Sequence, residues 1–80
     1  MSESIEYKYK GYDFKLHLYH PDFTELYWYE DTMVCIISAK FKDGKKWVMK
    51  SIISIEMYEK EIEALKKMLA DDLINMVPGP

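Results

Sequence analysis

The side chains in this sequence that could hold a metal ion are two histidines and the aspartates near them. His17 and His20 lie close to Asp13 and Asp22, and imidazole and carboxylate groups are common metal ligands. The segment around His17 alternates as a β-strand does, and strand residues three apart point to opposite faces of a sheet. Pro21 then ends the alternation directly after His20. We therefore expect both histidines to be exposed polar residues, and we predict no metal site.

Cys35 is the single cysteine of the chain and the next candidate for chemistry, as a nucleophile. It lies between Val34 and Ile36 in an apolar run, where a thiol usually packs as an inert side chain. The three glycines are scattered, so no glycine-rich loop is available to hold phosphate groups. These patterns predict a protein that is not an enzyme and that binds no cofactor.

Lysines crowd the middle of the chain beside two aromatic residues, Phe41 and Trp47. The lysines are Lys40, Lys42, Lys45, Lys46 and Lys50. Basic side chains interleaved with aromatic ones are typical of proteins that bind single-stranded nucleic acid. Against that function, the chain has no arginine and its net charge is −3. Nucleic-acid binding through Lys40, Lys42, Lys45, Lys46 and exposed tyrosines is therefore the alternative hypothesis.

Length and composition indicate one small globular domain spanning residues 1–80. Of the 80 residues, 49% are hydrophobic and 31% are charged, as in folded proteins. No apolar run approaches the roughly 18 residues of a membrane-spanning helix, and residues 1–4 lack the features of a signal peptide. A lone cysteine excludes a disulfide within the chain, and we expect a cytoplasmic protein. Abundant Lys, Tyr and Ile without Arg match A+T-rich coding, as in many phages and mobile elements.

A long β-hairpin is predicted between residues 32 and 53, around the turn Lys42-Asp43-Gly44. Apolar residues alternate on both sides of this turn. A three-residue loop with Gly44 in the left-handed conformation sets Ala39 opposite Trp47 and Ile37 opposite Met49, so that apolar residues face one another. A loop one residue shorter would set Ile37 opposite Lys50, because a one-residue slip moves every side chain to the other face. The apolar pattern selects the three-residue loop.

A first hairpin is predicted over residues 5–19, with Lys10-Gly11 as its two-residue turn. Pairing Tyr9 with Tyr12 brings Tyr7 opposite Phe14 and Ile5 opposite Leu16. Residues 24–29 form a possible further strand. A tight turn at Glu30-Asp31 would pair Trp28 with Met33 and Leu26 with Cys35. The expected sheet is an antiparallel meander of four to five strands.

A long C-terminal helix is predicted over residues 55–76, with Ser54 as its N-cap. Its apolar residues recur every three or four positions, at Ile55, Tyr58, Ile62, Leu65, Leu69, Leu73 and Met76. Glu56 with Lys60 and Glu63 with Lys67 are spaced to form ion pairs on the solvated side. Pro78 ends the helix, and short disordered ends are expected. The helix should cover one face of the meander, which gives an α+β fold.

Two apolar surfaces remain after this core is assigned. On the outer sheet face they comprise Tyr19, Tyr27, Tyr29, Val34, Ile36, Val48 and Ile52, and on the helix Met57, Ala64 and Met68. A contiguous exposed apolar set marks a binding surface more often than isolated residues do. The first hypothesis is therefore a non-enzymatic protein-interaction module, as a homodimer or with a foreign partner. Its most specific version is a phage or mobile-element accessory protein that binds and inhibits a host protein.

Overall fold

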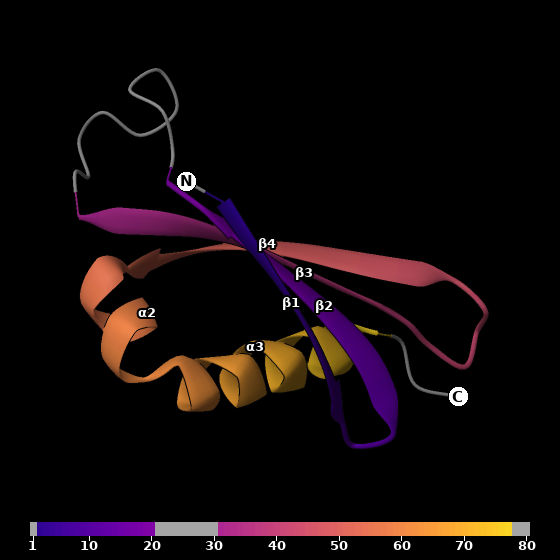
Figure 1. Ribbon diagram of the computed structural model, residues 1–80. Helices are drawn as coiled ribbons and strands as arrows, with labels where there is room; N and C mark the ends of the chain where they lie inside the picture. The colour runs from indigo at the N-terminus through magenta and orange to yellow at the C-terminus, as the bar shows by residue number, and fades with distance from the viewer. Residues whose placement is uncertain (1, 21–30, 78–80) are drawn as a thin grey trace.

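The computed structural model describes residues 2–20 and 31–77, and it shows one antiparallel sheet with two helices (Figure 1). The elements are β1 (Ser2–Tyr9), β2 (Tyr12–Tyr19), β3 (Thr32–Lys40), β4 (Lys46–Ser54), α2 (Ile55–Lys60) and α3 (Ile62–Met76). The described strands pair in the order β1-β2-β3-β4, so each strand lies beside its neighbour in the chain. Both helices lie on the same face of the sheet. The predicted α+β meander with a C-terminal helical layer is confirmed.

The first hairpin has the predicted register. Tyr9 pairs with Tyr12, Tyr7 with Phe14 and Ile5 with Leu16. At the turn, Lys10 has φ 51° and Gly11 has φ 84°. Two successive residues with positive φ are typical of a type I′ turn, whose twist matches that of the flanking strands.

The second hairpin also has the predicted register and loop. Ala39 pairs with Trp47 and Ile37 with Met49, and Gly44 has φ 78°. The Gly44 amide donates to the Phe41 carbonyl at 2.9 Å, and the Phe41 amide donates to the Lys45 carbonyl at 3.2 Å. These two bonds close a three-residue loop in which a left-handed glycine restores the strand pairing.

Residues 24–29, the possible further strand, lie outside the described residues. In the described sheet, Cys35 pairs with Leu18 of β2 on one side and with Ser51 of β4 on the other.

The C-terminal helix is not continuous, which corrects the prediction of one long helix. Ser54 caps α2 as expected, because its side chain accepts a hydrogen bond from the Met57 amide at 3.1 Å. The chain leaves helical geometry at Glu61, with φ −132° and ψ 37°, and α3 begins at the next residue. This break lets α2 follow the end of β4 while α3 runs along the sheet (Figure 1).

The buried face of α3 is rotated from the predicted stripe. Leu65, Leu69 and Leu73 are buried as expected, but so is Ala70, whereas Met76 is 51% exposed. The buried arc extends toward Ala70 and Ile74, so Met76 lies at its margin in the last turn. Assigning Met76 to the core was therefore wrong.

The core lies between the helices and one sheet face. Its buried members are Phe14, Leu16, Leu18, Met33, Cys35, Ile37, Ala39, Phe41, Ile53, Leu65, Leu69, Ala70 and Leu73. Polar contacts add to this packing at the first hairpin, where the Tyr7 hydroxyl donates to the Lys66 carbonyl at 2.9 Å and Lys10 pairs with Asp71 at 2.8 Å. Among the described helices, none is long and apolar enough to cross a membrane. α2 and α3 thus cover one face of the sheet and leave the opposite face, the outer sheet face, uncovered by either helix.

Candidate interaction surface on the outer sheet face

The outer sheet face, opposite the helices, is built from rows of side chains that cross the four strands. The strand registers align Ser2, Tyr19, Val34 and Ile52 in one row, and Ser4, His17, Ile36 and Lys50 in the next. A third row holds Glu6, Lys15, Ser38 and Val48. The face therefore changes from polar on β1 to mixed apolar and basic on β4.

Val34 was expected in an exposed patch on this face, and that expectation is wrong. Val34 is 0% exposed, and its neighbour Ile36 is half-buried. Both residues belong to β3, a central strand, and Val34 lies between Tyr19 of β2 and Ile52 of β4 in its row. Tyr19 on β2 is also half-buried, and its ring lies 5.7 Å from that of His17. Val34 is therefore not available to a partner.

The exposed apolar residues of this face lie on β4. Val48 is 52% exposed and Ile52 is 49% exposed. Lys46 and Lys50 alternate with them on the same side of the strand, because residues two apart in a strand share a face. These four residues, Lys46, Val48, Lys50 and Ile52, are called the β4 stripe below.

The remaining predicted interface residues do not join the β4 stripe. Met57 is half-buried in α2, where it packs against the core on the helical side of the sheet. Met68 is 44% exposed on α3, in the helical layer across the sheet, so the structure does not bring it together with Val48 and Ile52. Tyr27 and Tyr29 lie outside the described residues.

The predicted lysines gather only in part. Lys40 and Lys46 face each other across β3 and β4, at the end of the hairpin. The preceding pair, Phe41 and Lys45, is hydrogen-bonded, so Lys40 and Lys46 form a non-hydrogen-bonded pair, in which opposite side chains come closest. Lys42 is exposed on the loop, and Lys45 is exposed in the pair that closes it. Like charges directly opposite each other destabilise a sheet unless an anion offsets them.

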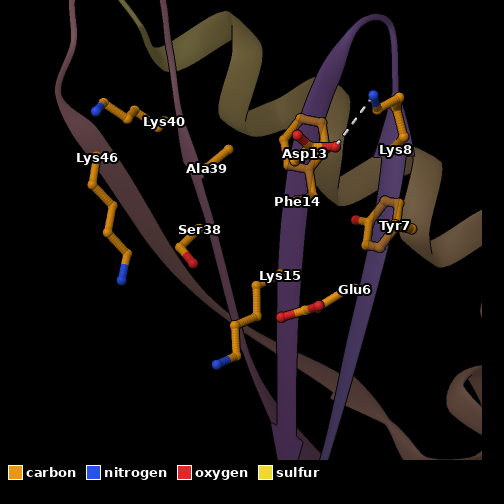
Figure 2. Close-up of a pocket in the computed structure, with 10 residues that line it drawn as sticks. All are labelled: Glu6, Tyr7, Lys8, Asp13, Phe14, Lys15, Ser38, Ala39, Lys40 and Lys46. Carbon is orange, nitrogen blue, oxygen red and sulfur yellow. Dashed lines mark ion pairs between the residues drawn. The ribbon is translucent and has the colours of Figure 1, made fainter.

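A shallow hollow next to this pair adds two lysines that sequence reasoning missed, Lys8 and Lys15 (Figure 2). It extends over Ser38, whose small side chain leaves space between β2 and β4. Lys8 pairs with Asp13 at 3.7 Å, whereas within residues 2–20 and 31–77 no carboxylate lies within ion-pair distance of Lys15, Lys40 or Lys46. Figure 2 shows the Lys40 and Lys46 amines pointing away from each other. The alternation of the first hairpin indicated that Lys8 and Lys15 point to the outer face of the sheet. Only the pairing of β2 with β3 places them beside Lys40 and Lys46.

The aromatic residues expected beside the lysines are not available for stacking. Phe41 is 7% exposed in the core, and Trp47 is half-buried against it. The Trp47 indole nitrogen donates to Asp43 at 3.0 Å. The backbone amide of Lys45 and this indole both donate to Asp43 and lower the pKa of its carboxyl. Phe41 and Trp47 therefore do not form the base-stacking platform of a typical single-strand binder.

Catalytic and metal chemistry find little support in the described part of the chain. Cys35 is fully buried, and burial raises the pKa of its thiol to about 11, so the reactive thiolate is scarce at neutral pH. The His17 ring nitrogen Nδ1 lies 3.0 Å from the Ser4 hydroxyl. Within residues 2–20 and 31–77, no three His, Cys, Asp or Glu side chains gather closely enough to hold a metal ion.

The ion pairs predicted on the helices form in part. Glu56 and Lys60 pair as predicted, whereas Glu63 pairs with Lys66 at 3.0 Å rather than with Lys67.

Comparisons of the chain with protein-family models, with curated proteins and with solved structures found no match.

Proposed function

We propose that this protein is a non-catalytic module that binds another protein through the β4 side of its outer sheet face. The observation that carries the proposal is the exposure of Val48 and Ile52, 52% and 49%, which alternate with Lys46 and Lys50, two lysines without a carboxylate partner among the described residues. Such exposed aliphatic residues, on a sheet face that neither α2 nor α3 covers, suit an interface.

Burial of Val48 and Ile52 alone would supply only part of the binding free energy of an interface. Full burial of a Val or Ile side chain contributes about 1.5–3 kcal/mol, so covering two half-exposed ones contributes about the same in total. Micromolar affinity corresponds to about 8 kcal/mol. Polar and charged contacts must therefore supply much of the binding energy, and lysines are the charged groups at hand.

The charges also favour a partner that differs from this chain. A twofold dimer through this face would bring Lys40, Lys46 and Lys50 of one copy toward those of the other. The small size of the chain and its bias toward amino acids with A+T-rich codons support the most specific version. In that version the protein is an accessory protein of a phage or mobile element and blocks a host protein. Single-stranded nucleic acid is a second candidate because of the lysine pair, although Phe41 beside it is buried and Trp47 is half-buried.

The test uses affinity capture from a lysate of the native host, quantified by mass spectrometry. Ile52→Glu should abolish capture of whichever protein the wild type retains. Met68→Glu is the matched control, because Met68 is similarly exposed, 44%, but lies on the helical layer. Circular dichroism checks that both variants fold. Equal capture by wild type and Ile52→Glu would overturn the proposal.

A further inference from the structure

β4 ends the described sheet on one side, and its backbone is positioned to receive another strand. The sheet order leaves β1 and β4 as edges. Because Phe41 and Lys45 are a hydrogen-bonded pair, the odd-numbered residues of β4 bond to β3. The even-numbered residues then direct their N–H and C=O groups to the open edge. Those even-numbered residues are the β4 stripe, whose side chains lie on the outer face.

The same four residues therefore present both backbone groups and side chains to any strand that pairs with β4. Residues directly opposite in an antiparallel pair interact most strongly, and opposite charges or apolar pairs stabilise it. A strand that carries carboxylates opposite Lys46 and Lys50 and apolar side chains opposite Val48 and Ile52 would match every position. We infer that the partner binds by adding an extended segment to the edge of β4, an inference that rests on the proposed function. At every second position of that segment, acidic and apolar residues alternate.

The other edge and a second copy fit this role less well. The outward side chains of β1 include Ser2, Ser4 and Glu6, with no apolar residue among them. Full-length antiparallel pairing of β4 with β4 of a second copy would set Lys50 opposite Lys50. Charge complementarity therefore points to a foreign acidic segment at β4.

The test uses two synthetic peptides with blocked ends. Val-Thr-Glu-Thr-Val-Thr-Glu carries the expected pattern in antiparallel orientation, and Val-Thr-Lys-Thr-Val-Thr-Lys reverses its charges. Nuclear magnetic resonance titration of the full chain should show about tenfold tighter binding of the acidic peptide. The double variant Lys46→Glu, Lys50→Glu should reverse this preference. Lys42→Glu, Lys67→Glu is the control, since it changes the net charge equally away from β4 and should keep the wild-type preference.

Amide hydrogen exchange separates strand addition from other modes of binding. The acidic peptide should slow exchange at the amides of Val48, Lys50 and Ile52, whose N–H groups would become hydrogen-bonded. No discrimination between the peptides, or binding without this protection, would overturn strand addition. Concentration-dependent protection without peptide would also overturn it, by showing a second copy at the edge. Capture that is sensitive to Ile52→Glu would still support the proposed function in each of these cases.

Discussion

At the scale of single residues, the inner sheet face buries core positions, whereas the edge strand β4 leaves apolar residues of the outer face exposed. Ile37 is 0% exposed beneath the helices, whereas Val48, on the edge strand, is 52% exposed. Alternation placed both residues on their correct faces, since side chains of a strand point to opposite sides in turn. The same rule could not tell that Val34 is buried, because alternation assigns a face and not the amount of cover on it.

Truncating Ile37 should therefore be far more costly than truncating Val48. We expect Ile37→Ala to lower the free energy of unfolding by about 2–5 kcal/mol, because it leaves a cavity in the core. Val48→Ala should cost less than about 1 kcal/mol, since little of its contact area lies in the core. Urea denaturation followed by circular dichroism measures both values. Equal losses would show that the two faces contribute alike to stability.

At the scale of elements, polar contacts attach the first hairpin to α3. The Asp71 carboxylate accepts hydrogen bonds from Lys10 at 2.8 Å and from the Tyr9 hydroxyl at 3.1 Å. The hydrogen bond and charge of Lys10, and then the Tyr9 hydroxyl, lower the pKa of the Asp71 carboxyl below its usual 3.8. Hydrogen bonds to the charged form favour that form.

Asp71→Asn should therefore destabilise the protein in a pH-dependent way. The folded pKa is depressed, so the stabilisation is present above the unfolded pKa and is lost as pH falls through the folded pKa. The stability difference between wild type and Asp71→Asn should be largest near neutral pH and shrink in strong acid. Urea denaturation at a series of pH values measures it, with Asp72→Asn, an exposed neighbour, as the control. A difference that does not change with pH would contradict this assignment.

At the scale of the whole molecule, charge is distributed between two layers. The outer sheet face carries Lys15, Lys40, Lys46 and Lys50 against Glu6 and Asp13, while the helical layer carries exposed Glu56, Glu59, Glu61 and Glu63 against Lys60 and Lys67. The mild net charge of −3 conceals this asymmetry. An uneven field of this kind would favour the acidic partner proposed for the sheet and would oppose pairing of two sheet faces.

We therefore expect the isolated protein to elute with the mass of one chain in size-exclusion chromatography with light scattering. Ile36→Lys should leave that mass and the circular dichroism spectrum unchanged, because Ile36 is half-buried on the outer face rather than in the core. A dimer that Ile36→Lys converts to a monomer would instead show that two copies associate through this face.

Both hairpins, their turns, the start of the helix and the outward direction of Val48 and Ile52 could be predicted from the sequence. Period-two alternation and local turn chemistry are sufficient for these features, because each depends on residues close together in the chain. Only the folded chain shows the break at Glu61, the rotation of α3 toward Ala70, the burial of Val34 and the meeting of Lys15 with Lys40 and Lys46. Each of these depends on contacts between elements distant in sequence, which periodicity does not encode.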